Sequence, residues 1–521
     1  MNVIDKALRV ISPQRALRRE VARQKLNIIS NSGYSNHGAS YHKKSLRGFI
    51  ANGGSAEEDI EDNIKILRER SRDLYMGAPI ATGALKTMRT NIVGSGLRLK
   101  SNIDYEFLGL SEEEADNLER TIEREFSHWA NNVNCDMARQ NDFYELQQLA
   151  FLSSIMNGDS LALLPFKQRI GCIYDLRIQL IEADRLCNPN YTESTEEISQ
   201  GVEVNSDGEV VAYHIANFHP LSTRYSTDRK WTRVEAFGKT TGRRNVIFLM
   251  ESERIGQRRG VPLLSPVIES LKQLGRYTDA ELMAAVVSGM FTVFIENESS
   301  NDGNSIGESI LPDEQIDEEN ENSYELGNGS ILELAEGQKV NEVNPGRPNT
   351  AFEGFVSAIC KQIGTALEIP HDLLLKQFNA SYSASRAALL EAWKMFRMRR
   401  TWIANDFCQP IFEEWMCEAV AKGRIYAPGF FESPIIREAY CKAKWSGPSQ
   451  GQLDPVKEAN AAVVRVENGF STRAQETIEL TGSDFNENNR QRIKEEKMRM
   501  QIPDSKKGFV VQEGDKSNEK D

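Results

Sequence analysis

The sequence predicts an α+β protein with several structural units. The clearest helical pattern covers residues 350–421, where apolar residues recur at three- and four-residue steps. Residues 160–250 instead contain short runs rich in β-branched residues, with a plausible hairpin turn at 205–208. At 521 residues the chain is too long for a single hydrophobic core. These observations favour a mixed chain divided into two to four units.

The first half of the chain predicts helices that are followed by strands. Residues 1–55 are basic, polar and without periodicity, which indicates a loosely ordered arm. Helical patterns follow over 59–91, 111–129 and 143–157, and then the β-rich stretch begins. Residues 260–291 are helical again, and two prolines lie in the first turns of this segment, where proline costs least.

An acidic insertion follows a strand expected at 291–295. Residues 296–342 hold fourteen acidic residues against the one base, Lys339. Short strand signals remain at residues 330–334. We therefore expect a solvated insertion that carries a small β element.

The central stretch predicts two helices separated by a polar loop. The first helix ends before Pro370, since proline lacks an amide hydrogen and restricts the residue before it. The second runs over 386–421, and we expect Pro410 to kink it. A helical segment follows at 455–497, and the polar residues at the C-terminal end are expected to be disordered.

Composition argues against several classes of protein. No stretch approaches 18 uncharged apolar residues, so no membrane span is predicted. The seven cysteines are scattered and form no CxxC pair, which favours reduced thiols over a disulfide framework or a zinc site. The net charge of −13 argues against a surface that binds DNA non-specifically.

No catalytic motif has the spacing that its chemistry requires. Residues 94–101 and 237–241 resemble phosphate-binding loops but lack a required glycine, and 447–451 matches G-x-S-x-G without a strand before it. The six histidines form no metal-binding pattern, and the acidic run 313–321 lacks the spacing of a calcium loop. We therefore predict no enzyme, no cofactor and no metal.

Three blocks of sequence, in this order, carry a resemblance to a known family. They are RIGQRRGVP at 254–262 with RYTDAEL at 276–282, then GTALEIP at 364–370 with NASYSASR at 379–386, and lastly GP at 447–448 with DPVKE at 454–458. Together they resemble the portal proteins of tailed bacteriophages, of the lambda type, from about residue 74 to residue 481. The resemblance implies a ring of twelve subunits at one capsid vertex, through which double-stranded DNA is packaged and ejected.

The resemblance also implies the portal fold, with a mixed α/β wing, a two-helix stem, a small α/β clip and a helical crown. Its parts correspond to the wing at 56–259, stem helix 1 at 260–291, the acidic clip at 292–349, stem helix 2 at 350–368, the tunnel loop at 369–385, the long wing helix with its following segment at 386–451, and the crown at 452–498. The arm at 1–55 and a tail at 499–521 lie outside this plan.

The same resemblance assigns three sets of candidate residues. The tunnel loop would present to DNA Lys376, Gln377, Asn379, Ser381 and Ser383. The clip would dock the packaging motor through Glu314, Asp317, Glu318, Glu319, Glu321, Tyr324 and Leu326. Subunit interfaces would use Arg386, Arg397, Arg399 and Arg400.

The implied partners are further copies of the chain, the terminase large subunit, a head–tail connector, the major capsid protein and double-stranded DNA, with no membrane. The implied location is the portal vertex of the virion, after assembly in the host cytoplasm. Two alternatives remain open, namely another structural protein of the head and a DNA-processing enzyme. A nuclease would need clustered carboxylates on a folded scaffold, whereas the clustered acids lie in a low-complexity stretch.

Overall fold

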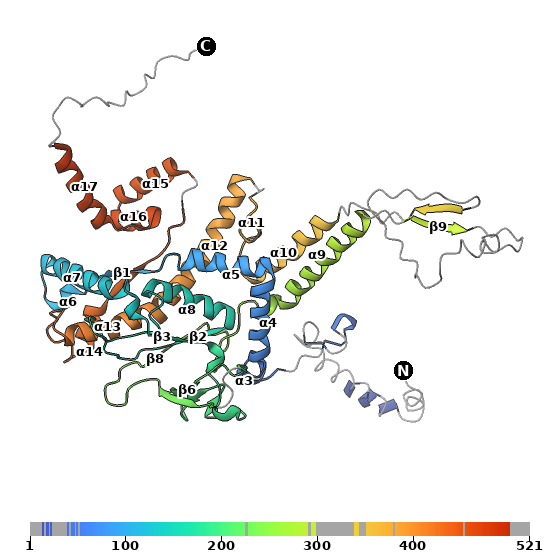
Figure 1. Ribbon diagram of the computed structural model, residues 1–521, viewed down its shortest axis with the longest axis horizontal. Helices are drawn as coiled ribbons and strands as arrows, with labels where there is room; N and C mark the ends of the chain where they lie inside the picture. The colour runs from blue at the N-terminus through green and yellow to red at the C-terminus, as the bar shows by residue number, and fades with distance from the viewer. Residues whose placement is uncertain are drawn as a thin grey trace, which may run out of the picture. The chain divides into compact units, whose positions relative to one another are not determined.

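The computed structural model describes residues 53–223, 228–289, 351–378, 381–451 and 454–500, the strands at 293–297 and 338–342, and short pieces before residue 50 (Figure 1). The chain divides into two compact units, Met1–Ser55 and Ala56–Asp521. The first unit has a short 3-10 turn at Lys44–Leu46, and the elements below belong to the second. None of the described helices is long and apolar enough to cross a membrane.

Six helices and one strand form the first part of the second unit. In chain order they are α3 (Ala56–Asp59), α4 (Ile64–Gly77), α5 (Pro79–Ile92), β1 (Arg98–Ser101), α6 (Tyr105–Leu108), α7 (Glu112–Ala130) and α8 (Phe143–Asn157). Capping boxes begin α7 at Ser111 and α8 at Asp142, each satisfying backbone donors that a helix start leaves free. Pro79 starts α5, where its missing amide hydrogen is not needed.

The β-rich stretch contains two antiparallel sheets. The first has the order β3 (Gln179–Ile181), β2 (Asp159–Leu163) and β8 (Val246–Met250). The second has the order β4 (Ile198–Ser199), β5 (Val202–Val204), β6 (Val210–Ala216) and β7 (Trp231–Glu235). The hairpin turn predicted at 205–208 joins β5 to β6, with Gly208 at a φ of 81°. The mixed α and β content confirms the predicted fold class.

The rest of the chain is mainly helical. Its elements are a 3-10 turn at Ser265–Val267, α9 (Ile268–Gly289), β9 (Val293–Asn297), β10 (Gln338–Glu342), α10 (Phe352–Ala366), α11 (His371–Leu375), α12 (Tyr382–Ile403), α13 (Gln409–Ala421), α14 (Pro434–Cys441), β11 (Ala443–Ser446), α15 (Pro455–Glu467), α16 (Arg473–Thr481) and α17 (Phe485–Met500). Strand β9 pairs with β10, and β1 pairs with β11.

The structure refines three local predictions. The polar loop expected after Pro370 contains the short helix α11, and the long helix begins at Tyr382. Where we expected Pro410 to kink the long helix, the structure has a π-helical turn at Ala404–Cys408, and Pro410 lies at the start of α13. A wider turn accommodates a residue that cannot donate its amide hydrogen. The strand expected at 330–334 lies outside the described residues.

One aromatic cluster joins sequence segments about 300 residues apart. The ring centroids of Phe126 and Trp415 lie 5.1 Å apart, and those of Phe126 and Phe143 lie 5.6 Å apart. Phe412 and Trp445 pack against the same rings. The core of the predicted wing therefore includes α7, α8, α13 and β11, so both the early and late parts of the chain are needed to close it.

Candidate functional site

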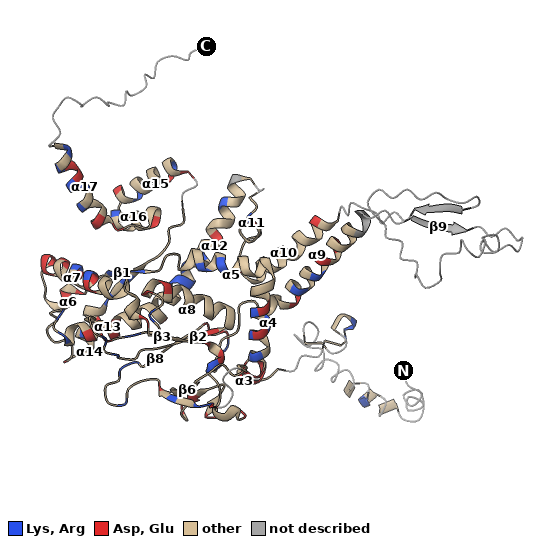
Figure 2. Cartoon of the chain, viewed as in Figure 1, with Lys and Arg blue, Asp and Glu red and all other residues tan. Residues whose placement is uncertain are grey.

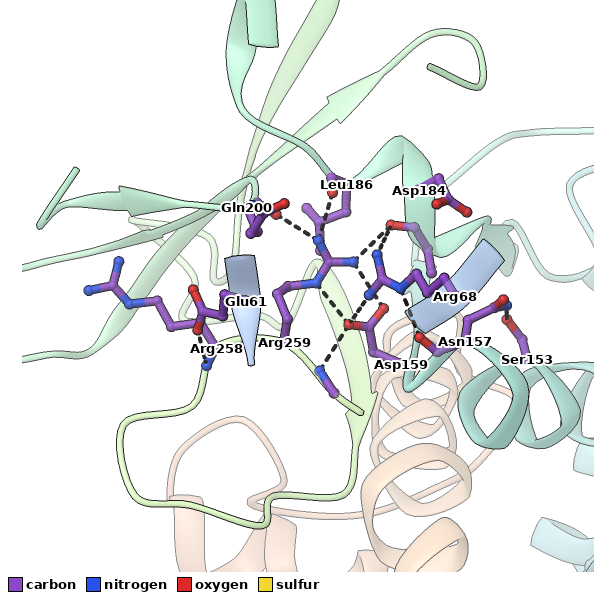
Figure 3. A network of polar contacts seen from close by, with 12 residues as sticks. Glu61, Arg68, Ser153, Asn157, Asp159, Asp184, Leu186, Gln200, Arg258 and Arg259 are labelled. Carbon is purple, nitrogen blue, oxygen red and sulfur yellow. Dashed lines mark hydrogen bonds and ion pairs between the residues drawn. The ribbon is translucent and has the colours of Figure 1, made fainter. Parts of the chain in front are cut away.

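Residues 254–262, the first of the three blocks that carry the resemblance, anchor the start of α9 to the sheet. Arg259 is fully buried, and its Nε and Nη2 lie 2.8 and 3.1 Å from the two carboxylate oxygens of Asp159 at the start of β2 (Figure 3). Its remaining hydrogens go to three backbone carbonyls, those of Leu186, Gln200 and Ala183. Every part of this guanidinium is therefore bound within the protomer.

A second arginine shares the same carboxylate. Arg68 of α4 donates from Nη2 to Asp159 Oδ2 at 2.7 Å and from Nε to the carbonyl of Asn157 at 2.8 Å. Burial alone would raise the pKa of Asp159, but the charges of Arg259 and Arg68 outweigh it and hold that pKa below its ordinary value. Burial, with repulsion from Arg259, lowers the pKa of Arg68 to about 10. We call Arg68, Asp159 and Arg259 the buried anchor.

Two glycines let the backbones meet beside the buried anchor. A Cβ atom on Gly260 would lie 1.9 Å from the carbonyl oxygen of Gly158, and one on Gly158 would lie 2.1 Å from that of Gly260. The amide of Gly260 also donates to Asp159 Oδ2 at 3.1 Å. Only glycine fits at either position, and the chain entering α9 is consequently held at a fixed place on the sheet.

Helices α9 and α10, which cover most of the two segments predicted to form the stem, lie side by side (Figure 1). Near the root Leu271 and Leu274 are buried, and Tyr277 packs on Phe355 with ring centroids 4.9 Å apart. Charged residues stand along the first part of α9 (Figure 2), but the sequence has none over 282–289. Leu282 is 66% exposed and Phe355 is 50% exposed, and Met283 and Val286 are exposed as well. We call these four residues the stem apolar face.

The predicted tunnel-loop residues are exposed where the structure describes them. Lys376 caps α11 in the left-handed region, with a φ of 56°, and Gln377 follows it. Ser381 and Ser383 are exposed, with hydroxyls 3.3 Å apart at the start of α12. Asn379 lies outside the described residues. Their role toward DNA stays a prediction, as does that of the seven clip residues, which all lie outside the described residues.

The four predicted interface arginines divide into two pairs. Arg399 is buried, and its guanidinium lies 3.5 Å from Glu251 and from Glu368. Arg400 donates to the carbonyls of Ile92 and Asn91, and burial, with repulsion from Arg397, lowers its pKa to about 10. These two side chains contact their own protomer, so the predicted interface role rests on the other two.

Arg386 and Arg397 line an open cavity beside α12. Its volume is about 520 Å³, and α15 and α16 form its far wall. Arg397 is more than half exposed and lies 3.9 Å from Glu479 of α16. Arg386 is partly buried, and the interface role of both arginines stays a prediction.

One side-chain cluster in the described residues has the composition of a metal site. Glu182, Asp184 and His219 bring their ligand atoms within 4.8 Å of one another. Arg72 forms an ion pair with Asp184, and His219 lies 3.6 Å from the same carboxylate. The guanidinium of Arg72 therefore already provides a counter-charge for Asp184, the acid that His219 also approaches.

Comparisons with known proteins agree with the resemblance of the three blocks. The model of the phage portal protein, lambda family, matches residues 42–400. The chain is 24% identical to portal protein B of Escherichia phage lambda over 485 residues, covering 89% of each chain. It is also 24% identical to the portal protein of Escherichia phage N15 over 492 residues, covering 90% of this chain and 91% of that one.

Solved structures with a similar chain come from gene transfer agent particles. The neck of the native particle, with C12 symmetry, matches with a TM-score of 0.42 and 11% identity, over 80% of this chain and 93% of that one. The neck of the empty particle, with C6 symmetry, matches with a TM-score of 0.44 and 11% identity, over 80% and 92%.

These matches decide between the classes that the sequence left open. Portal proteins are structural proteins of the phage particle, so the prediction that the chain is not an enzyme is confirmed, and the alternatives of a DNA-processing enzyme and a non-portal head protein are excluded. The family model covers well over half of the sequence. This chain belongs to the lambda family of phage portal proteins.

Proposed function

We propose that twelve copies of this chain form a ring at one capsid vertex, and that double-stranded DNA passes through its channel during packaging and ejection. The stem apolar face is the observation that best supports assembly into a ring. Leu282, Met283 and Val286 are exposed within five residues of α9, and Phe355 of α10 is half exposed. A cluster of exposed apolar side chains marks an interaction site, and further copies of the chain would cover it.

The charge of the chain suits a channel that lets DNA slide. Each subunit carries a net charge of −13, so twelve carry −156 (12 × −13). Each lysine or arginine that neutralises a phosphate adds affinity through counterion release. In our proposal the channel wall is mostly acidic or neutral, and Lys376 makes one weak phosphate contact per subunit, helped by Gln377, Asn379, Ser381 and Ser383.

The acidic clip provides the docking surface for partners in this proposal. Fourteen acids against one base over residues 296–342 would present an acidic collar to the terminase large subunit and then to a head–tail connector. Such contacts weaken as ionic strength rises, because exposed charges are screened. The wing would contact the major capsid protein. Assembly takes place in the host cytoplasm, and the ring then stays in the virion.

Two observations test the proposal. The purified chain should form rings with a central hole in negative-stain images, and a chain that stays monomeric or dimeric at all salt concentrations would contradict it. Replacing Lys376, Gln377 and Asn379 together by alanine should then leave rings intact but give underfilled or leaking heads. Lys394→Ala is the matched control, since Lys394 is an exposed lysine of α12 that pairs with Glu391. Normal packaging by the loop variant removes the loop from the mechanism.

A further inference from the structure

Arg399 of α12 is a buried cation at the junction of the predicted wing and stem. It is 6% exposed, and its Nη1 lies 3.7 Å from the sulfur of Met88 on α5 and 3.5 Å from that of Met395 on α12. Sulfur is a weak acceptor and carries no charge that could balance a guanidinium. Among the described residues, the carboxylates that pair with Arg399 are those of Glu251 and Glu368.

The two acids come from different parts of the fold. Glu251 directly follows β8 of the wing, and its Oε2 lies 3.5 Å from Nε of Arg399. Glu368 follows the end of α10, and its Oε2 lies 3.5 Å from Nη2 of the same arginine. Nε makes no hydrogen bond within the described residues, so its contact with Glu251 is an ion pair alone. One guanidinium thus joins the wing to the end of the second predicted stem helix.

The backbone at Glu368 adopts a conformation that needs support from its surroundings. Leu367 and Ile369 on either side are buried, and Glu368 between them lies in the left-handed region with a φ of 57°. This region is unfavourable for a residue with a side chain unless neighbouring contacts hold it there. The side chain of Glu368 is 56% exposed, so apolar packing supports it little. The ion pair with Arg399 therefore supplies a charged contact that favours this turn.

Two cavities border this turn, and Glu368 lines both of them. One has a volume of about 250 Å³ and is also lined by Glu251, Arg399 and the end of α8. The other has a volume of about 550 Å³ and is lined by α10, α12 and residues 368–371. A segment with open space on two sides is held less firmly by packing than one that side chains enclose. The start of α9 differs, because the buried anchor holds it against the sheet.

We propose that Arg399 is a positioning residue for the predicted tunnel loop. By joining Glu251 to Glu368 it fixes the turn from which α11 and the rest of the loop at 369–385 continue, so the root of the loop keeps its place against the wing. Without that charge, the turn and α11 move into the neighbouring cavities while α9 stays fixed. The inference rests on the proposed role of the loop toward DNA and adds a residue that sets the position of the loop.

Hydrogen–deuterium exchange of the purified full chain is the first test. Glu368→Gln removes the charge of an exposed side chain and leaves the core intact, and it should speed exchange over residues 366–378 about tenfold by making local opening easier. Residues 254–262 around the buried anchor should exchange as in wild type. Glu391→Gln is the matched control, since Glu391 is exposed and lines the larger cavity but pairs with Lys394. Unchanged exchange over 366–378 in Glu368→Gln would contradict the inference.

A double-mutant cycle is the second test, and it separates the charge of Arg399 from its packing. Arg399→Met keeps an apolar side chain at this position, and it should speed exchange over residues 366–378 at least as much as Glu368→Gln does. The double variant should exchange no more than about twofold faster than Arg399→Met alone, because both substitutions remove one shared interaction. Arg399→Lys keeps the charge and should exchange more slowly than Arg399→Met. Independent effects that multiply in the double variant would overturn the inference.

The inference and the proposed function fail separately. Unchanged exchange in both Glu368→Gln and Arg399→Met overturns the role of Arg399 but leaves the ring and the role of the loop in place. Normal packaging by the alanine variant of the loop removes the loop from the DNA mechanism, while faster exchange in Glu368→Gln would still place Arg399 in control of the position of the loop.

Discussion

The wing and the stem use their side chains in opposite ways. In the wing even charged groups are enclosed, since Arg68, Asp159 and Arg259 satisfy one another inside the protomer. Over residues 282–289 of α9 the reverse holds, because the sequence lacks charge and apolar side chains such as Leu282 are exposed. Helix α15 also exposes apolar side chains, at Val456 and Val463. From this difference we predict that the wing region is stable in the separated protomer, whereas the predicted stem and crown bury their exposed apolar side chains in an assembly.

The largest expected loss of stability comes from substitution within the buried anchor. Asp159→Ala leaves two buried guanidinium groups facing each other without their counter-charge, and we expect a loss of about 3–5 kcal/mol in the free energy of unfolding. Denaturant unfolding of the protomer measures it. Asp228→Ala removes an exposed ion pair with Lys230 and should cost no more than about 0.5 kcal/mol. Equal losses from the two variants would contradict the role of the anchor.

Substitution at the contact between Gly158 and Gly260 should destabilise the protein almost as much as Asp159→Ala. Gly260→Ala places a Cβ against the carbonyl of Gly158, and we expect the free energy of unfolding to fall by about 3 kcal/mol. Gly275→Ala, within α9, meets no atom within 4 Å and should stabilise the protein by about 0.5–1 kcal/mol. Thermal unfolding of both variants provides the comparison. A neutral Gly260→Ala would show that the stem root is not held where the structure places it.

Substitution in the stem should affect assembly and leave folding unchanged. Leu282→Asp should raise the concentration for half assembly by about tenfold, which corresponds to about 1.4 kcal/mol. The unfolding free energy of the protomer should stay within about 0.5 kcal/mol of wild type, because the side chain is exposed there. Phe107→Asp, a similarly exposed position on α6 of the wing, is the control and should assemble normally. Ring formation measured by mass photometry would separate the two.

A smaller effect on stability is expected from pH, through the sheet formed by β4, β5, β6 and β7. Hydrogen bonds from Arg233, and the one with His214, lower the pKa of Glu203 to about 2 against an ordinary value of 4.5. Because the folded pKa is the lower one, this stabilisation is present above about pH 4.5 and is lost as pH falls toward about 2. Glu203→Gln should therefore cost about 1 kcal/mol at neutral pH and weaken the dependence of stability on pH in that window. Glu209→Gln, in the exposed turn, should retain the wild-type dependence.

Local sequence signals predicted most of the elements but not the buried anchor. The apolar periodicity of α10 and α12 and the turn at 205–208 depend on neighbouring residues, so they could be predicted from the sequence. Asp159 and Arg68 are 91 residues apart, and nothing in a single sequence shows that two such residues meet. One signal was present, since Gly158-Asp159 places an acid at the start of an otherwise apolar strand.

The sequence predicted which candidate residues are exposed in the polar loop, but not which arginines of α12 face their own protomer. Exposed polar residues such as Lys376 follow from their place in a polar loop between two apolar helices. Arg399 and Arg400 lie on α12, and their contacts with Glu251 and Asn91 depend on how that helix packs on the wing. Helical spacing alone does not distinguish an arginine that faces a partner from one that faces the same protomer.

Hydrogen–deuterium exchange on assembled rings and on separated protomers tests the contrast between the two regions most directly. The account predicts slower exchange in rings along α9, α10 and α15, with no change in β2 and in residues 254–262 around the buried anchor. The same exchange in both states along α9, α10 and α15 would contradict it, as would protection that appears only in the wing.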